Sequence, residues 1–457
     1  MTIYKTILCA LVFIFSLIGC KNESNNQNNS KKPPGSLTEE ALLDTVQKQT
    51  LKYFWEYAEP NSGMARERYH PDGDYPKDDA HIVTTGGSGF GLMAIVVGME
   101  RGFIPRDSAV SRLDRIANFL NDTPRFHGVW PHWLNGETKE TQSFSKKDNG
   151  ADLVETSFLA QGFIVVREYL KTGNANEKKL AKKYDQLWKS IEWEWYTNTK
   201  NGLYWHWSPD YQWEMDFMIE GYNECLITYI MAASSPDFAI EPEVYHQGWA
   251  RGGNIVSDKK AYGMPLILKH NTSGDKAGPL FWAHYSYLGL NPKHLSDKYA
   301  NYWDLNVNHS KINYQYTQEN PNNYQTYNSN SWGLTASYTR NENGKIGYTA
   351  HSPDTDRGVV SPTAAISSIP YTPELSLAAM RYFFEDQNEL LWGPAGFYDA
   401  FSLDKEAWVA PKYLAIDQGP QIVMIENYRS GLIWELFMGA EEVQNGLRNL
   451  GFNFSSN

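Results

Sequence analysis

Apolar side chains recur at helical spacing along most of the chain, and this period limits the fold more than any other feature. Residues 90–97 and 219–231 are apolar nearly all round, whereas residues 177–189 are laced with Lys and Glu. Such a mixture of buried and solvated helices predicts an all-α toroid, in which an inner ring of helices is covered by an outer ring. The helical segments are 38–57, 110–120, 151–169, 177–188, 218–233, 373–384, 419–438 and 441–450.

Signals for β-strands are few, so we expect only minor β-hairpins in the loops of the toroid. The clearest hairpin covers residues 203–215 and turns near Pro209. No break in composition marks a second domain, so residues 37–457 are expected to form a single domain. The connections at 320–331 and 340–358 are long for a compact helical domain, and loops of this length usually serve function or act as lids.

The N-terminus has the features of a lipoprotein signal peptide. Lys5 precedes a short apolar run over residues 7–18, which is too short to span a bilayer and closes in Gly19 and Cys20. We therefore expect residues 1–19 to be removed and Cys20 to carry lipid. Residues 20–36 hold no large apolar side chain and are expected to be a disordered tether. The expected location is the outer membrane, on its periplasmic side or at the cell surface, a choice that the sequence leaves open.

The net charge limits the classes of binding partner, and the cysteine content excludes disulfides as a source of stability. The formal net charge of -12 argues against nucleic acid as a partner and disfavours polyanionic substrates. Once the leader is removed and Cys20 is acylated, Cys225 is the remaining thiol, so an intrachain disulfide is excluded. Cys225 lies on an apolar stripe without an evident activating base, and we interpret it as a core residue.

Aromatic residues are abundant, with 16 Trp and 29 Tyr, and many stand in polar segments such as 130–133 (WPHW) and 204–207 (YWHW). Rings with a polar group can pack a large core, and they can equally stack on sugar faces while hydrogen-bonding to hydroxyls. Taken together they favour carbohydrate as the ligand.

Three carboxylates stand close together in the segment 148–155. Asp148, Asp152 and Glu155 are four and three residues apart, so a helix that begins here would align them on one face. Stacked like charges repel, which indicates a purpose other than helix stability. A structural alternative is that an Asp at a helix start accepts backbone amide hydrogens. That alternative accounts well for Asp148 and less well for the two deeper acids.

Two glutamates, Glu220 and Glu224, interrupt the otherwise apolar helix predicted over 218–233. A carboxyl group in such surroundings is expected to have a raised pKa, the property that a general acid needs near neutral pH. Glycosidic cleavage requires one such acid and a second carboxylate that attacks or activates water, with no metal or cofactor. The alternatives are weaker, because no spaced metal-binding signature is present and the glycines at 86–89 lack a P-loop lysine. Small residues that let helices pack closely explain those glycines better.

The chain resembles the bacterial glycoamylase-like proteins and, within them, glycoside hydrolase family 144, whose members act on β-1,2-glucan. The motifs that carry the resemblance are 89–92 with 97–102, 148–156, 219–224 and 419–431. The resemblance implies an (α/α)6 barrel, inverting hydrolysis, and Asp148, Asp152 and Glu224 as the acidic residues of the cleft. We assign Glu224 as the acid and Asp152 as the base that directs water. Asp148 then binds sugar or tunes the pKa of its neighbour.

Further residues are expected to bind substrate. An arginine beside a glutamate on the last apolar helix can be a structural ion pair or a sugar clamp. The expected substrate-binding set is Glu155, Glu220, Trp130, Trp205, Glu374, Trp392, Tyr398, Glu426 and Arg429.

Three functions remain open on the sequence. The first is a β-1,2-glucan hydrolase, cutting internally or releasing sophorose from chain ends, and acting as a monomer. The second is a hydrolase, phosphorylase or transglycosylase of another glucan. The third is a glycan-capture lipoprotein without catalysis, which several acids on apolar helices argue against.

Overall fold

The computed structural model describes residues 36–271, 273–341 and 344–455. The expected signal peptide, Cys20 and nearly all of the tether lie outside the described residues. Residues 38–457 form one compact unit. In the described part of the chain, no helix has both the length and the apolar character that a membrane span requires.

Helices dominate this unit. They are α1 Glu39–Trp55, α2 Thr85–Glu100, α3 Arg106–Asn121, α4 Leu153–Leu170, α5 Ala175–Lys189, α6 Leu226–Ser234, α7 Pro242–Val244, α8 Tyr302–Glu319, α9 Pro362–Ser367, α10 Pro373–Arg381, α11 Asn388–Leu391, α12 Ala415–Arg429, α13 Leu432–Met438 and α14 Glu441–Asn449.

The strands are short and pair in small sheets. They are β1 Arg68–Tyr69, β2 Ile82–Thr84, β3 Trp133–Asn135, β4 Thr141–Gln142, β5 Ala151–Asp152, β6 His206–Trp207, β7 Lys260–Ala261, β8 Met264–Pro265, β9 Ala336–Arg340, β10 Ile346–Ala350, β11 Trp392–Gly393, β12 Gly396–Phe397, β13 Ala400–Ser402, β14 Trp408–Ala410 and β15 Tyr413–Leu414. The longest pair is β9 with β10, and the pair that shapes the site is β5 with β6.

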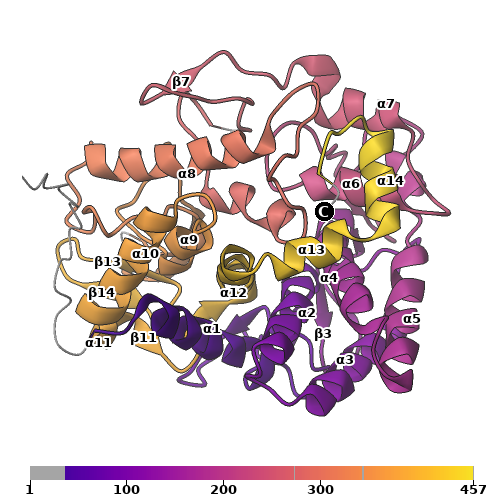
Figure 1. Ribbon diagram of the computed structural model, residues 1–457, viewed down its shortest axis with the longest axis horizontal. Coiled ribbons are helices and arrows are strands. Elements are labelled where there is room, and N and C mark those ends of the chain that lie inside the picture. The colour runs from indigo at the N-terminus through magenta and orange to yellow at the C-terminus, as the bar shows by residue number, and fades with distance from the viewer. Residues whose placement is uncertain (1–35, 272, 342–343, 456–457) are drawn as a thin grey trace, which may run out of the picture. The chain divides into compact units, whose positions relative to one another are not determined.

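The buried helices form a closed inner ring. Helix α2 packs on α4 and on α12, α4 packs on α6, and α12 packs on α9. The short 3-10 turns Leu280–Ala283 and Tyr285–Tyr287 close the ring, because the second packs on α6 and His284, between them, is hydrogen-bonded to Ser368 after α9 at 3.0 Å. The amphipathic helices α1, α3, α5, α8 and α10 lie outside this ring; in Figure 1, α12 lies near the centre of the view and α3, α5 and α8 towards its edge. The predicted double ring is therefore present.

Glycines allow the inner helices to approach closely. A Cβ atom on Gly89 of α2 would lie 2.2 Å from the carbonyl oxygen of Phe158 in α4, and one on Gly162 would lie 2.5 Å from the carbonyl oxygen of Gly89. Real Cβ atoms do not come this close, so each position requires glycine. The interpretation of the glycines at 86–89 as packing residues is confirmed.

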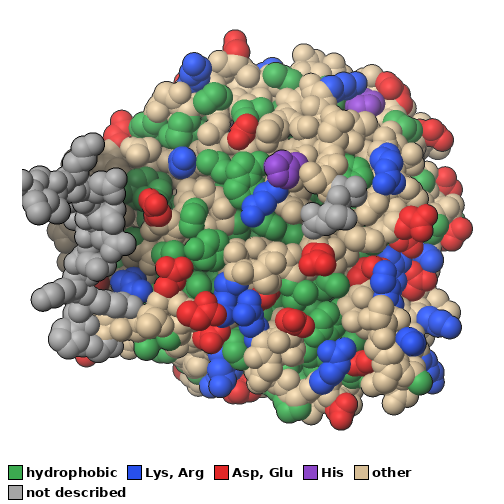
Figure 2. Space-filling view, viewed as in Figure 1, with side chains coloured by type: hydrophobic (Ala, Val, Ile, Leu, Met, Phe, Trp, Pro, Cys, Tyr) green, Lys and Arg blue, Asp and Glu red, His purple; other side chains and the backbone are tan. Residues whose placement is uncertain are grey.

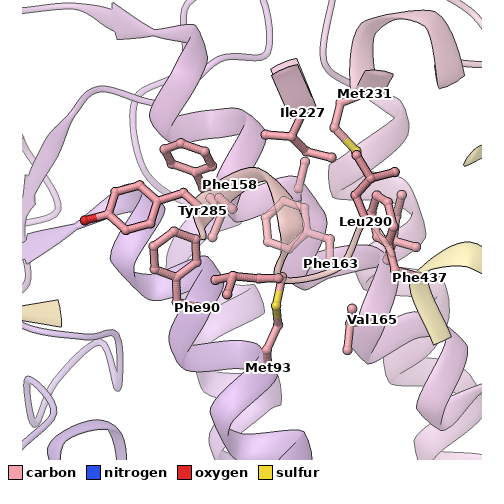
Figure 3. Packing of buried hydrophobic residues seen from close by; sticks show 14 of the residues in the cluster. Phe90, Met93, Phe158, Phe163, Val165, Ile227, Met231, Tyr285, Leu290 and Phe437 are labelled. Carbon is pink, nitrogen blue, oxygen red and sulfur yellow. The ribbon is translucent and has the colours of Figure 1, made fainter. Parts of the chain in front are cut away.

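The apolar core lies between the two rings and inside the inner one. The ring of Tyr285 packs between Phe90 of α2 and Phe158 of α4, and its hydroxyl group points away from the apolar side chains (Figure 3). Cys225 is fully buried in this core, as predicted. On the face that Figure 2 presents, acidic and basic side chains are interspersed rather than segregated.

Several predicted boundaries were wrong for identifiable reasons. The helix expected over 218–233 begins only at Leu226, because residues 219–222 exchange backbone hydrogen bonds with Leu203, Trp249 and Asn271. The helix expected over 419–438 is split at Gly431, whose φ of 75° ends α12. Residues 340–358 include strand β10 and are not one loop.

Candidate active site

Asp148 and Asp152 converge where the short pair β5–β6 meets the start of α4. Strand register places Asp152 opposite His206. Asp152, the N-cap residue of α4, accepts a hydrogen bond from the Glu155 amide at 2.9 Å, while Asp148 lies in the turn before β5. The expectation that one helix carries all three acids is therefore wrong, and the capping role that suited Asp148 belongs to Asp152. The acids are nevertheless held together at one helix end.

Two histidines bind these aspartates. The Nδ1 atom of His132 lies 2.8 Å from an oxygen of Asp152 and 3.8 Å from Asp148. The Nε2 atom of His206 lies 3.4 Å from Asp148 and 3.6 Å from Asp152. Both histidines stand in the aromatic segments 130–133 and 204–207, where the tryptophans were the more conspicuous signal. The register of β5 with β6, which identifies His206, is a tertiary property.

The charges of the two histidines and the two aspartates stabilise one another. Burial opposes protonation of His132, but the neighbouring carboxylates of Glu155, Asp152 and Asp148 outweigh it and raise the pKa of the imidazole to about 9. The pKa of His206 is raised to about 9 in the same way. Burial would raise the pKa of Asp152, yet hydrogen bonds from the two imidazoles hold it well below the usual range. Asp152 is therefore a fixed anion between two imidazolium groups.

His132, Asp148 and Asp152 also form a set of donors that could hold a metal ion, since one atom of each lies within 4.8 Å of the others. The 2.8 Å contact between His132 and Asp152 is a direct hydrogen bond, and that bond accounts for the geometry without an ion. The expectation that the reaction needs no metal or cofactor stays a prediction.

Glu155 reaches from α4 to the start of α2. One of its carboxylate oxygens accepts a hydrogen bond from the Gly86 amide at 2.8 Å and lies 3.4 Å from the Thr84 hydroxyl. Burial raises its pKa, and the charge of His132 offsets part of this increase. Glu155 is thus a carboxyl group that can bind and release a proton near neutral pH.

Glu224 lies in the turn before α6, and its backbone carbonyl accepts a hydrogen bond from the hydroxyl group of Ser286. The residue is partly exposed, between the buried Asn223 and Cys225. Burial of the carboxyl group, followed by the charges of Glu155 and Asp152, raises its pKa to about 7. A reachable carboxyl group that remains protonated near neutral pH can donate a proton to a leaving oxygen.

Asp399 and Asp417 form a second pair of acids that could not be recognised from the sequence. Asp417 lies in the first turn of α12, and Asp399 precedes β13 and accepts a hydrogen bond from the Tyr338 amide at 2.7 Å. Both side chains are buried, and their carboxyl groups are close enough to raise the affinity of one of them for a proton. Burial raises the pKa of Asp399 to about 6 and that of Asp417 well above its ordinary value. No spacing pattern links 399 and 417, so the pairing is visible only in the fold.

The hydroxyl group of Tyr285 is near acids of both sets, because it interacts electrostatically with Asp417 as well as with Glu224 and Glu155. It is buried and has no hydrogen-bond partner among the described residues. Acids of both sets therefore lie around this one buried hydroxyl group, and we call the region around it the central space.

The structure places several predicted substrate-binding residues elsewhere. Trp130 is fully buried, and its indole nitrogen donates to the Leu120 carbonyl and the Thr123 hydroxyl, so it is a core residue. Glu220 is exposed and forms an ion pair with Arg251 at 3.1 Å. The prediction of sugar contact was wrong for Trp130, whose side chain is committed to core partners, and the ion pair of Glu220 gives it no place among the carboxylates of the site.

The pair Glu426 and Arg429 is structural. Glu426 binds Arg101 at 2.7 Å, and Arg429 binds Asp44 at 2.7 Å, so the two do not form a clamp with each other. Both lie at the end of α12 opposite to Asp417. The sugar-clamp interpretation was therefore wrong for both residues.

The remaining predicted residues lie at the edge of the site or outside it. Trp205 stacks on His206, with ring centroids 5.6 Å apart, and so adjoins the acids. Trp392 packs edge-on against Phe397, and Tyr398 packs on Tyr413, in the segment that leads to Asp399. Glu374 is exposed in the first turn of the outer helix α10, which gives it no role at the carboxylates.

Substituting alanine for Gly86 is expected to lower kcat/KM about 100-fold, because a Cβ atom there would lie 2.5 Å from the Glu155 carboxylate. The carboxylate would have to leave the Gly86 amide and shift within the site. Steady-state kinetics with a thermal melt as the control for folding measure this effect. A folded Gly86→Ala protein with unchanged kcat/KM would show that the position of Glu155 is unimportant.

Comparisons with known proteins identify the family and the fold. Residues 216–441 match the Glycoamylase family. The chain is 42% identical over 448 residues to an exo β-1,2-glucooligosaccharide sophorohydrolase (non-reducing end) of Parabacteroides distasonis; the match covers 94% of this chain and 60% of that protein. The chain thus spans about 60% of the length of the curated relative.

Two solved structures are similar over almost the whole chain. The endo-β-1,2-glucanase from Chitinophaga pinensis, solved with sophorotriose and glucose, is 54% identical with a TM-score of 0.89, covering 92% of this chain and 99% of that one. The β-1,2-glucanase from Parabacteroides distasonis is 42% identical with a TM-score of 0.84, covering 91% and 60%. The predicted (α/α)6 architecture is confirmed.

Proposed function

Because the chain belongs to the glycoamylase-like family and, within it, to glycoside hydrolase family 144, we propose that it hydrolyses β-1,2-glucan to sophorose or short oligosaccharides with inversion at the anomeric carbon. The observation that carries the proposal is the protonatable carboxyl group of Glu224, which lies beside the fixed anion Asp152 and, like Asp417, near Tyr285. Inverting hydrolysis requires a proton donor and a proton acceptor on opposite sides of the bond that is cleaved.

Glu224 is the proton donor in this proposal. Its carboxyl group is protonated in a large share of molecules at neutral pH and is reachable from the central space. It gives its proton to the glycosidic oxygen as the bond to the anomeric carbon breaks, and the leaving sugar keeps that proton as a hydroxyl group.

The assignment of Asp152 as the base is revised. Its oxygens are occupied by the Glu155 amide and the His132 imidazole, and its pKa is far below neutral, so it is a weak proton acceptor. We assign Asp152, with Asp148, the role of an anion that fixes the imidazolium groups. Those groups are oriented donors for sugar hydroxyls, as expected where charges are preorganised.

The proton acceptor is drawn from the carboxyl groups whose pKa is raised. Asp417 belongs to the second set of acids, whereas Glu155 and Glu224 belong to the first, and all three interact electrostatically with Tyr285. Because an inverting enzyme activates water on the face opposite to its acid, we assign this role to Asp417, supported by its neighbour Asp399. Replacing Asp417 by asparagine should then abolish turnover, while Glu155→Gln should retain measurable activity.

The rate should fall as pH rises above about 7, because the proton donor acts only while protonated. On this alkaline limb kcat/KM decreases about tenfold per pH unit. A pH profile of kcat/KM, measured with buffers of constant ionic strength, tests this. A rate that stays constant to pH 9 would contradict the assignment of Glu224.

A panel of linear glucans tests the function itself. Products released from the β-1,2-linked chain and from none of the β-1,3-, β-1,4- or α-1,4-linked chains support the proposal. A ladder of product lengths means internal cuts, and sophorose alone means attack at chain ends. Degradation of a different chain favours the alternative of another linkage, and binding without any product favours a glycan-capture protein.

We further propose that the protein is exported and anchored through lipid on Cys20, with residues 20–36 as its tether, at the outer membrane. Support comes from the apolar run 7–18 followed by Gly19 and Cys20. Cys20→Ser should move the protein from the membrane fraction to the soluble fraction of the cell. Unchanged membrane association would contradict lipid anchoring. We also propose that it acts as a monomer.

A further inference from the structure

Large apolar side chains that remain exposed are concentrated at the site. In the described part of the chain they are Phe144, Phe217, Val256, Tyr262, Ile346 and Tyr348. The three most exposed are Tyr348 at 53% and Phe144 and Phe217 at 51% each, and each of these lies against groups of the active site. Half-exposed aromatic rings beside buried acids indicate a surface that a ligand covers.

Phe144 covers the first histidine. Its ring stacks on that of His132 with centroids 4.2 Å apart and an interplanar angle of 29°, and it meets Trp133 at 4.8 Å. Its backbone amide donates to the carbonyl oxygen of Asp148 at 2.9 Å. The position of this exposed ring is therefore fixed by the same turn that carries a site aspartate.

Phe217 covers the second histidine from another segment of the chain. Its ring is parallel to that of Trp205, with centroids 5.3 Å apart and planes 4° apart, and lies 6.4 Å from His206. The Trp205 amide donates to the Phe217 carbonyl oxygen at 3.0 Å. The rings of Phe217, Trp205 and His206 are nearly parallel and lie close to one another, so the exposed Phe217 adjoins the histidine that binds the acids.

Tyr348 stands on the side of the second acid pair. It pairs across the β9–β10 hairpin with Tyr338, whose amide donates to Asp399. Its hydroxyl group interacts electrostatically with Asp417 and Asp399 while half of the residue is exposed. A third exposed ring, from a third segment, therefore lies beside the other set of acids.

We propose that Phe144, Phe217 and Tyr348, the rim rings, are stacking positions for glucosyl units of a glucan that extends beyond the bond being cleaved. This inference rests on the proposed function and adds the groups that recognise chain length. A pyranose ring presents C–H groups on one face, which pack on an aromatic ring while its hydroxyls remain in water. Rings beside both sets of acids would hold the glucan on each side of the glycosidic bond that is cleaved and align that bond between Glu224 and Asp417.

The test compares single alanine variants of the rim rings on long β-1,2-glucan and on the shortest β-1,2-oligosaccharide that the wild-type protein cleaves. We expect kcat/KM on the long chain to fall about tenfold for each variant, mainly through KM, with a much smaller change on the short one. Phe217→Trp and Phe144→Trp should retain activity, because a ring is kept. Tyr262→Ala, an exposed aromatic residue that binds Glu319 and lies outside the site, serves as the matched control.

Binding is measured separately from chemistry with Glu224→Gln as the background. Titration of long β-1,2-glucan into this protein should show affinity lost on adding Phe217→Ala or Phe144→Ala. Equal losses on short and long substrates would mean that the rings only position the histidines, and would overturn the proposal. Unchanged kinetics and affinity would overturn it too, while cleavage of β-1,2-glucan by the wild-type protein would still uphold the proposed function.

Discussion

Glu224→Gln lowers kcat on β-1,2-glucan by about 10³-fold or more and leaves the fold intact. The substitution keeps the shape of the side chain and removes the proton that the leaving oxygen receives, a contribution of about 10² to 10⁴ in rate for general acids. The neutral amide also relieves the repulsion between Glu224, Glu155 and Asp152 that raises the pKa of Glu224. The variant should therefore be at least as stable as the wild-type protein.

The matched control is Glu220→Gln, four residues earlier in the same segment. Glu220 is exposed and pairs with Arg251, so its loss should leave kcat within about twofold of the wild-type value. Initial rates of reducing-sugar release for both variants, with thermal melts, make the comparison. Similar losses in both variants, or full activity in Glu224→Gln, would remove Glu224 from the mechanism.

Asp152→Asn is expected to lower both activity and stability strongly. Asn can still cap α4, but it leaves the imidazolium group of His132 without its nearest anion and that of His206 without one of its two anions. Breaking a buried ion pair costs about 3–5 kcal/mol. We expect a loss of stability of this order and a fall in kcat of at least about 100-fold, because the donors that the anion orients are displaced.

The loss of stability in Asp152→Asn should be larger at low pH than at high pH. The pKa values of His132 and His206 are raised to about 9, so their stabilising contribution is complete below the ordinary histidine value of about 6.5 and is lost as pH rises through about 9. Chemical denaturation of wild type and variant at pH 6.5 and pH 9.5 should give a larger difference at the lower pH.

The exposed pair His127 and Glu192, with a contact of 2.8 Å, offers a control of the same chemistry. Glu192→Gln should change stability by less than about 1 kcal/mol at either pH. A difference between Asp152→Asn and wild type that is equal at both pH values would show that the histidines near Asp152 are neutral.

Local chemistry explains which parts of the fold could be predicted. The apolar helix α4 and the amphipathic α5 follow their spacing of side chains and lie close to the predicted ranges, whereas α2 begins at Thr85, before the apolar run 90–97. Helix α8 escaped prediction because its sequence is rich in Asn and Tyr, which are weak helix formers, and its stability comes from packing. Residues 219–222 have an apolar pattern that suits a helix, but backbone pairing with distant segments prevails there.

The residues of the site also divide into those that the sequence identifies and those that only the fold brings together. Asp152, Glu155 and Glu224 could be identified because each acid interrupts an apolar segment, and Asp148 because of its spacing from Asp152. The partners that define their protonation could not, because His206 meets Asp152 through strand register and Asp417 meets Asp399 through the closure of the ring. The role of Trp130 could not be predicted, because a tryptophan in a polar segment can be buried or can bind sugar. Here the indole is buried and donates to Leu120.

A proton NMR time course on linear β-1,2-glucan tests the central claim most directly, because it reports both bond cleavage and the anomer first formed. We predict new reducing ends that appear as the α-anomer and then mutarotate, since inversion of a β-linkage gives the α-product. New ends that appear first as the β-anomer would contradict the inverting arrangement of Glu224 and Asp417. No new ends from this glucan, with cleavage of another, would contradict the proposed substrate.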